Sequence, residues 1–387
     1  MGEDLKPFAT IDRGETHSVK YEAREKLFGS KDVIPLWVAD MDIASPFEIQ
    51  QAIAKRASHP IYGYTTYPLE FFNAISYWTR RRYNWEIEER WIVPSCGVVP
   101  SINFAIEAYT KIGEGVIVQP PIYPPFFTSI KAHGRKLLEN KLIYKDGKYS
   151  IDFEDFEAKA KVAKLFLLAS PHNPTTKAWS KDELSKMVEI CQKYGIVIVS
   201  DEIHADIIYK GKFISIGSFG YEKTLVLNAP SKTFNIAGLK TSYAIIKDRQ
   251  LRIDFQRVQK NAGVESGNPF GIEALIVAYT KCEPWLEELK AHLFSNITTI
   301  SNALTHTPIS PVATEATFLM WLDCHHLFDT HEEVLEFFYK KAKLGLSDGA
   351  SFGIDGERFM RLNVAISQER VGVLLERLKI AFGDYQR

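Results

Sequence analysis

The sequence predicts an α/β fold in which a large domain holds a mostly parallel sheet between helices and a smaller domain is α+β. Between residues 91 and 246, short apolar runs rich in β-branched residues, such as I-V-I-V-S at 196–200, alternate with helical periods. Runs without polar alternation are typical of strands covered on both faces in a parallel sheet. The length of 387 residues exceeds one typical domain, and the region beyond residue 306 mixes strand-like and helical stretches.

The elements follow from apolar spacing and from the residues that flank it. Ser45-Pro46 with Glu48 marks a helix start. Helices are expected at 46–57, 69–83, 98–111, 180–194, 330–344 and 367–382, with one between 143 and 164, and several between 249 and 306 that include a long helix from near residue 284. Strands are expected at 91–93, 115–119, 136–143, 164–169, 195–200, 224–228, 242–246, 317–322 and 359–365. We place the large domain at 47–288 and the small domain at 1–46 together with 289–387.

Composition argues against several classes of protein. The net charge of −1 gives no overall field for nucleic acid or an anionic membrane, and we expect neither as a partner. No apolar run approaches the roughly 20 residues needed to span a bilayer. The four cysteines are scattered without C-x-x-C spacing, which fits a reducing compartment. Because the first eight residues are acidic and lack an apolar stretch, we expect no signal peptide and a cytoplasmic protein.

Polar and aromatic residues follow the predicted strands, where ligands collect in doubly wound sheets. The turn P-S-C-G-V-V-P-S after 91–93 presents the amides of Gly97 and Val98 at a helix N-terminus, which suits a phosphate. After 115–119, flanking prolines hold Tyr123, whose ring either stacks on a planar heterocycle or simply packs. The turn after 164–169 presents Asn173.

A carboxylate and an amine complete this set of residues. Asp201 ends the most hydrophobic predicted strand, and a buried carboxylate needs a partner such as a cationic ring nitrogen. Lys232 follows the strand 224–228, and no acid occurs between residues 223 and 248. A lysine beside apolar walls has a lowered pKa, which makes its amine a nucleophile or base. Pyridoxal 5′-phosphate (PLP) is held by groups of these kinds: a phosphate-binding turn, a stacking ring, an amide, a carboxylate and an amine. The cofactor would be linked to Lys232.

The sequence resembles the fold-type I PLP enzymes of the aspartate aminotransferase superfamily over essentially its whole length, and within them the cystathionine β-lyase-like C–S lyases. The strings that carry the resemblance are P-L-W-V-A-D-M-D, G-Y-T-T-Y-P, G-V-V-P-S-I-N-F-A-I, P-H-N-P-T, S-D-E-I-H-A-D, A-P-S-K-T-F-N-I-A-G-L and F-M-R-L-N-V-A. The resemblance implies an aspartate-aminotransferase-like fold, a homodimer with a shared active site, and a place in methionine biosynthesis.

The resemblance also assigns roles to residues. Lys232 would bond the cofactor and move the Cα proton of the substrate, Asp201 would keep the pyridine nitrogen protonated, and Asn173 would hydrogen-bond the 3-hydroxyl oxygen. The ring of Tyr123 would stack on the cofactor and the amides of Gly97 and Val98 would bind its phosphate. Two further residues are implied: Tyr64, reaching the phosphate from the neighbouring subunit, and Arg361, binding the substrate α-carboxylate as a bidentate fork.

Four positions depart from the pattern of the superfamily or carry weaker assignments. Thr176 replaces a turn glycine in N-P-T-T, for which we expect a local backbone change only. His204 occupies a position where transaminases often have a tyrosine. The resemblance therefore implies that the His204 side chain contacts the cofactor oxygen. Lys240 occupies the position of a cationic phosphate ligand that is commonly arginine. Lysine keeps the positive charge but cannot bind the phosphate through two parallel N–H groups as arginine does. Ser231 either touches the phosphate or serves the turn.

The activity implied by the resemblance is α,β-elimination on cystathionine or cysteine S-conjugates, giving a thiol such as homocysteine, pyruvate and ammonia. An aminotransferase on the same scaffold is the alternative, and a regulatory binding protein is a lesser one, since some proteins of this branch act through protein contacts. The residues assigned above serve elimination and transamination alike, and they do not identify the physiological sulfur amino acid. No metal site is expected: Cys324, His325, His326 and His331 have poor ligand spacing.

Overall fold

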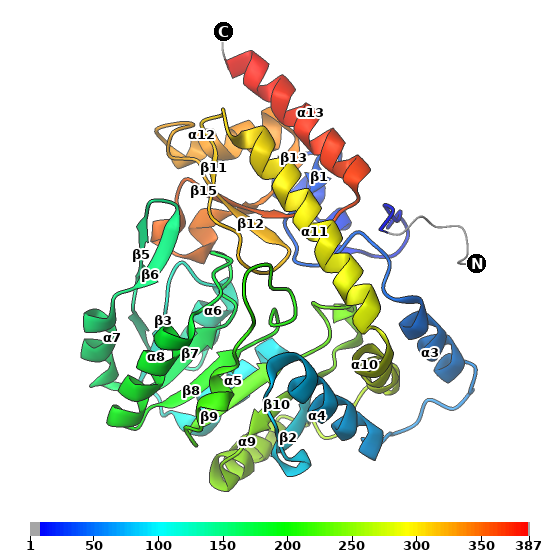
Figure 1. Ribbon diagram of the computed structural model, residues 1–387, viewed down its shortest axis with the longest axis vertical. Coiled ribbons are helices and arrows are strands. Elements are labelled where there is room, and N and C mark those ends of the chain that lie inside the picture. The colour runs from blue at the N-terminus through cyan, green and yellow to red at the C-terminus, as the bar shows by residue number, and fades with distance from the viewer. Residues whose placement is uncertain (1–7, 386–387) are drawn as a thin grey trace.

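The structure, a computed structural model that describes residues 8–385, is built around a seven-stranded sheet (Figure 1). The strand order is β2-β10-β9-β8-β7-β3-β4. The strands are β2 (Ile92–Ser95), β10 (Ser242–Ile246), β9 (Thr224–Asn228), β8 (Val197–Asp201), β7 (Ala163–Ala169), β3 (Gly115–Val118) and β4 (Lys136–Glu139). Neighbours pair in parallel except for β10, which is antiparallel to β2 and to β9. The predicted, mostly parallel sheet is therefore confirmed.

Both faces of this sheet are covered, as the unbroken apolar runs of its strands predict. In β7, Leu165 and Leu167 belong to one hydrophobic cluster, whereas Phe166 and Leu168 belong to another. The first cluster includes residues of α5 (Val98–Tyr109), α6 (Pro124–Ala132) and α9 (Arg249–Asn261). The second includes residues of α3 (Phe47–Ala57), α4 (Leu69–Tyr83), α7 (Phe153–Ala160), α8 (Lys181–Tyr194) and α10 (Pro269–Lys281).

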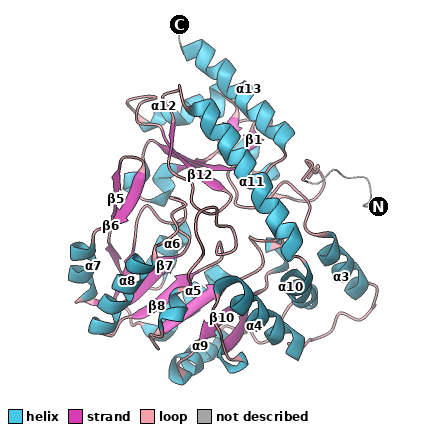
Figure 2. Cartoon of the chain, viewed as in Figure 1, coloured by secondary structure: helices cyan, strands magenta, loops and turns pink. Residues whose placement is uncertain are grey.

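A four-stranded antiparallel sheet forms a second layer and has its own core. Its order is β11 (Ser310–Pro311), β12 (Leu319–Asp323), β15 (Phe359–Asn363) and β14 (Ser347–Asp348). It packs with α11 (Glu283–Leu304), α12 (His331–Glu336) and α13 (Gln368–Tyr385), and α11 and α13 lie alongside one another in Figure 1. In Figure 2, loops run through the region between the two sheets.

Two predicted elements are wrong in extent. The strand expected at 136–143 is divided into β4 and β5 (Leu142–Lys145), which turns away to pair with β6 (Lys148–Ile151). The break falls at Asn140, whose buried side chain donates to the Asp152 carbonyl oxygen and to the Asp155 carboxylate. The helix expected at 330–344 ends as an α-helix at Glu336, and one π-helical turn (Phe337–Lys341) follows.

The amino-terminal region joins the second layer through a pairing that apolar spacing did not predict. After α1 (Val19–Glu22) and α2 (Arg24–Phe28), β1 (Ile34–Pro35) pairs in parallel with β13 (Leu344–Gly345). The boundary expected at residue 288 falls inside the continuous helix α11, and the division into 47–288 and the remainder stays a prediction. The stretch that suggested the absence of a signal peptide lies almost wholly outside the described residues. Within residues 8–385 no helix combines the length and the apolar character needed to cross a membrane.

The same region contains a buried ion pair whose removal we expect to destabilise the fold. Lys20 Nζ lies 3.1 Å from Asp42 Oδ1, and both side chains are completely buried. Lys20→Met removes one cation from the desolvated Asp42 carboxylate, which keeps its ion pair with Arg13 at 3.1 Å. The free energy of unfolding should therefore fall by about 3 kcal/mol, the low end for breaking a buried pair, measured by urea unfolding. The control is Lys31→Met, because the Lys31–Glu25 pair is exposed and such pairs contribute about 0–1 kcal/mol. Equal losses in the two variants would contradict this account.

Candidate active site

A cavity of about 660 Å³ lies at the carboxyl ends of the parallel strands. Ten of the eleven residues that the sequence singled out line it: Gly97, Val98, Tyr123, Asn173, Asp201, His204, Ser231, Lys232, Lys240 and Arg361. They come from both sheets: Arg361 lies on β15, Asp201 is the last residue of β8, and the others lie in the segments between elements of the seven-stranded sheet or at the start of α5. The structure thus brings together residues separated by up to 264 positions, from 97 to 361.

Lys232 lies in the turn after β9, with its amine inside the cavity wall. Its Nζ donates to the Ala39 carbonyl oxygen at 2.6 Å. Burial, reinforced by the positive charge of Arg361, lowers the pKa of Lys232 to about 8, while the carboxylates of Asp40 and Asp201 act in the opposite direction. About a tenth of the amine is therefore unprotonated at pH 7 and about half at pH 8, far more than for an ordinary lysine, and the unprotonated form is the one that attacks as a nucleophile and abstracts protons.

Asp201 ends β8, and its side chain is buried at the cavity wall. Its Oδ1 accepts from the Ile203 amide at 3.1 Å. Burial raises the pKa of Asp201 to about 6, although the Ile203 amide and Lys232 lower it. A cationic ligand group beside this carboxylate would favour its ionised form, as the sequence argument anticipated.

Arg361 and Asn173 contact one another across the two sheets. Arg361 Nη1 donates to Asn173 Oδ1 at 3.0 Å, and Nη2 donates to the Trp37 carbonyl oxygen at 2.8 Å and to Ser347 Oγ at 3.0 Å. Burial lowers the pKa of Arg361 to about 10, which leaves it cationic at neutral pH. No carboxylate pairs with this guanidinium among residues 8–385, so it can receive one from a ligand.

The N-terminus of α5 supplies amides rather than a side-chain cap. Gly97 has φ of +150°, a backbone conformation that favours glycine, and its amide already donates to Ser242 Oγ at 2.8 Å. Of the first-turn residues, Val98 and Val99 have N–H groups without intrahelical acceptors, and Pro100 has none. The amides available to a phosphate are thus those of Val98 and Val99, while Gly97 shapes the turn.

His204 is a buried, neutral side chain at the cavity wall. Burial, with the nearby charges of Lys232 and Arg361, lowers its pKa to about 3. Its ring packs edge-on against Phe318, with centroids 5.7 Å apart, and Nδ1 has no hydrogen-bond partner among the described residues. An unpartnered buried polar atom is costly, and together with the unpartnered Nε of Arg361 it suggests that a polar ligand belongs here.

The departures in sequence have local consequences only. Thr176 adopts φ of +60°, which a glycine would adopt without strain. Its amide donates to the His172 carbonyl oxygen at 2.8 Å and its hydroxyl to that of Ala313 at 3.3 Å, so the expected backbone change does not move Asn173 away from the cavity. Lys240 is exposed and Ser231 half-buried at the cavity wall.

Tyr64 is the one predicted residue that does not line the cavity. It is fully exposed on the loop before α4, beside the exposed Ile61 and Tyr62. Its proposed contact with a phosphate requires a second subunit and stays a prediction.

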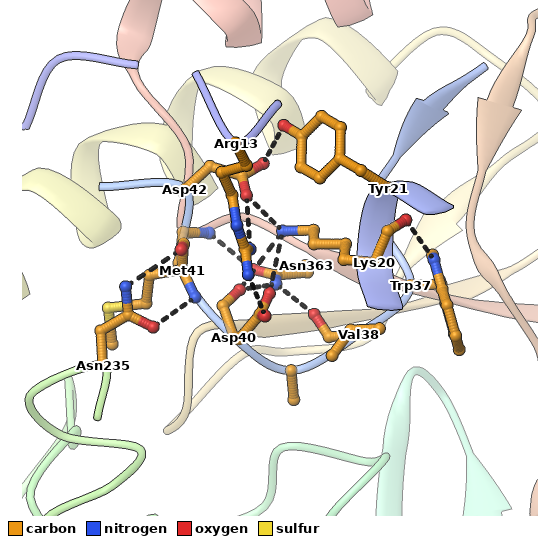
Figure 3. Close-up of polar contacts among 12 residues, drawn as sticks. Arg13, Lys20, Tyr21, Trp37, Val38, Asp40, Met41, Asp42, Asn235 and Asn363 are labelled. Carbon is orange, nitrogen blue, oxygen red and sulfur yellow. Dashed lines mark hydrogen bonds and ion pairs between the residues drawn. The ribbon is translucent and has the colours of Figure 1, made fainter. Parts of the chain in front are cut away.

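Sequence reasoning missed the contribution of the segment from Trp37 to Asp42. Residues 37–39 line the cavity, and the Trp37 and Ala39 carbonyls accept from Arg361 and Lys232. Figure 3 shows how the segment is held, with Asn235 on one side and Asn363 and Lys20 on the other. The signal that could have found it was the string P-L-W-V-A-D-M-D, which places two aspartates close to Trp37 and Met41 in an otherwise apolar stretch.

The residues present fit PLP. Asp201 can pair with the ring nitrogen, and the amine of Lys232 can bond to the aldehyde. The first turn of α5 and Lys240 can bind the phosphate, and Tyr123 can stack on the ring. The two unpartnered buried atoms, His204 Nδ1 and Arg361 Nε, are consistent with a polar ligand in the same cavity. Between residues 8 and 385, no group of three or more histidine, cysteine or carboxylate side chains is arranged to hold a metal.

Comparison with known proteins places the chain in a family. Residues 31–378 match the profile of the aminotransferase class I and II family, and the chain belongs to that family. It is 38% identical to the cystathionine β-lyase PatB of Bacillus subtilis, with 96% of this chain and 98% of that protein covered.

Two solved structures extend the comparison. Cystalysin from Treponema denticola, which contains PLP, superposes with a TM-score of 0.95 at 34% identity, covering 98% of this chain and 100% of that one. A PLP-bound protein from Clostridium difficile described as an aminotransferase has a TM-score of 0.94 at 36% identity, covering 97% and 98%. These likenesses confirm the aspartate-aminotransferase-like fold and the fold-type I, C–S lyase-like branch.

Proposed function

We propose that the chain is a PLP-dependent carbon–sulfur β-lyase, which converts cystathionine or another cysteine S-conjugate and water into a thiol, pyruvate and ammonia. The observation that carries the proposal is the meeting of Lys232, Asp201 and Arg361 in one cavity, in a chain 38% identical to a cystathionine β-lyase. The eleven site residues predicted from the sequence are part of this proposal, with Tyr64 contributed by a second subunit.

Arg361, Lys232 and Asp201 have separate roles in the elimination. Bound PLP supplies the electron sink that makes loss of the Cα proton feasible. Arg361 binds the substrate α-carboxylate through its guanidinium, which fixes the Cα–H bond relative to Lys232. The Nζ of Lys232, with its pKa lowered to about 8, takes the proton from Cα. The sulfur then leaves Cβ as a thiolate, and Asp201 remains the carboxylate that balances the cationic ring.

A second candidate function is transamination, because a structural neighbour at 36% identity is described as an aminotransferase. Lys232, Asp201, Asn173 and Arg361 serve either reaction. Elimination is the favoured proposal because the relatives named for C–S cleavage include PatB and a C–S lyase from Staphylococcus hominis.

A product assay separates the two reactions. The cofactor-loaded enzyme is incubated with L-cystathionine and no 2-oxo acid, and pyruvate and free thiol are measured over many turnovers. We expect the two products to accumulate in equal amounts, since elimination regenerates the starting enzyme. An aminotransferase would release no thiol, because transamination leaves the C–S bond intact. It would form at most one equivalent of the 2-oxo acid of cystathionine per active site, and sustained formation of that acid would require an added acceptor such as pyruvate.

Assembly, compartment and pathway complete the proposal. A homodimer is supported by the exposed aromatic and aliphatic side chains of Ile61, Tyr62, Tyr64 and Leu69 on one loop and the start of α4, since such patches mark interfaces. The scattered cysteines are free within residues 8–385, as in proteins of a reducing cytoplasm. Release of homocysteine from cystathionine would place the enzyme in methionine biosynthesis.

A further inference from the structure

The carbonyl groups of residues 36–40 alternate between site residues and Asn363 as donors, while Ser347 Oγ also donates to the Trp37 carbonyl at 2.9 Å and Lys20 Nζ to the Asp40 carbonyl at 3.3 Å. Those of Trp37 and Ala39 accept from the site residues, Arg361 Nη2 at 2.8 Å and Lys232 Nζ at 2.6 Å. The alternate carbonyls are bound by Asn363: the Leu36 carbonyl by its amide at 2.9 Å, and those of Val38 and Asp40 by its side chain at 2.6 Å each. Site residues and Asn363 therefore bind alternating positions of one segment. Figure 3 shows Asn363 beside Val38 and Asp40.

We propose that Asn363 is a positioning residue, which holds the Val38 and Asp40 carbonyls and thereby fixes the intervening Ala39 carbonyl against Lys232 and the Trp37 carbonyl against Arg361. The inference rests on the proposed function, because it concerns the lysine and the arginine of the same site. Asn363 does not line the cavity, so it acts through the segment and not on a ligand.

The geometry of Asn363 suits this role. It is completely buried, both carbonyls bind its single Nδ2, and its Oδ1 accepts from the Ala365 amide at 2.8 Å. An amide group whose two N–H bonds and oxygen are all engaged has one orientation, so it fixes the groups it binds. Arg361 and Asn363 are two residues apart on β15, and alternate residues of a strand share a face. One strand thus presents the guanidinium and the amide that bind successive carbonyls.

Asn296 on α11 provides a matched control. It is also buried, and its Nδ2 donates to the carbonyls of Val364 at 3.0 Å and Ile366 at 2.8 Å. The chemistry is the same, an asparagine amide joining carbonyls two residues apart, but none of these three residues lines the cavity. Asn296→Ala should therefore cost stability in the same way as Asn363→Ala, without reaching the site.

The first test measures carboxylate binding by the cofactor-loaded enzyme. Propionate has the carboxylate of a substrate and no amine, and its dissociation constant is measured by calorimetry. We expect Asn363→Ala to weaken propionate binding about tenfold, because a small displacement of a positioning group has large effects, and to raise KM for cystathionine by a similar factor. Asn296→Ala should change both constants less than about twofold.

The second test follows Lys232 in the cofactor-free, full-length chain by the pH dependence of its acetylation, with peptide mass spectrometry as readout. The pKa of about 8 for this amine should fall in Asn363→Ala, since the ammonium form loses a well-placed acceptor, and stay unchanged in Asn296→Ala. Propionate binding and the titration of Lys232 do not depend on thiol elimination, so failure of the lyase proposal would remove only the KM measurement and leave these two readouts valid.

The inference is overturned if Asn363→Ala and Asn296→Ala lose similar thermal stability and then show the same affinity for propionate and the same pKa of Lys232. Should Asn363→Ala not fold, Asn363→Ser, which keeps a donor for one carbonyl, provides the comparison, with smaller shifts in the same directions expected. Unchanged values in that folded variant would equally overturn it.

Discussion

Lys232→Ala should lose turnover by at least about 10³-fold, because among residues 8–385 no other amine lies at the same place in the cavity to take the proton from Cα. In this described part of the chain, the only other lysine that lines the cavity is Lys240, which is exposed. The variant should also lose the visible absorbance that arises when PLP is bonded to a lysine. Turnover is measured with L-cystathionine at saturating concentration, and the spectrum is recorded on the same preparation.

Lys223→Ala is the control for this variant. Lys223 lies before β9, and its Nζ donates to the Gly195 carbonyl oxygen at 3.3 Å at an exposed position, so its loss should leave turnover and spectrum unchanged. Equal activity in Lys232→Ala and the wild-type enzyme would remove the lysine from the mechanism.

Asp201→Asn should lower turnover by about 10²–10³-fold and weaken PLP binding, since an amide cannot balance a cationic ring nitrogen as a buried carboxylate does. In the wild-type protein, PLP binding should strengthen as the pH rises through about 6, the pKa of the buried Asp201 carboxyl. Below that pH the Asp201 carboxyl is protonated and neutral. Above it, the carboxylate can pair with the cationic ring nitrogen of PLP. The affinity is measured by titrating the cofactor-free chain with PLP between pH 5 and 8.

The neighbouring Glu202 offers a close control for Asp201. It is also completely buried, but its Oε1 accepts from Ser200 Oγ and from the Ile216 amide, away from the cavity. Burial raises the pKa of Glu202 to about 8, so the group is largely neutral at pH 7 and Glu202→Gln preserves its charge. The control should retain PLP affinity and its pH dependence, whereas Asp201→Asn should bind PLP more weakly and lose the pH dependence. If the pH dependence of PLP binding is unchanged in Asp201→Asn, it arises from the titration of another group.

Much of this site was predictable because strand ends are readable in a sequence. Residues 196–199 and 225–227 are wholly apolar, and these runs end two residues before Asp201 and five before Lys232. Such strands place the residues that follow them at one edge of the sheet. Arg361 was different: an arginine in a strand is usually exposed, and only the resemblance to a family assigned it to the site. The structure shows it buried beside Asn173, a residue 188 positions earlier.

The contribution of the segment at 37–39 could not be predicted in the same way, because the groups that act there are backbone carbonyls. Their positions depend on Asn235 and Asn363, which lie 194 and 325 residues from the carbonyls they bind at Met41 and Val38, and no local pattern encodes such pairings. The pairing of β1 with β13 was missed for the same reason, since each strand has two residues and neither shows a period. The division at Asn140 likewise depends on distant partners of one buried amide.

The account depends most directly on the covalent bond between PLP and Lys232. Reduction of the cofactor-loaded enzyme with borohydride makes that bond permanent, and peptide mass spectrometry identifies the modified lysine. We expect one pyridoxyl group per chain, on the peptide that contains Lys232, and none after the same treatment of Lys232→Ala. A pyridoxyl group on a different lysine, or none on the wild-type protein after loading, would contradict the account.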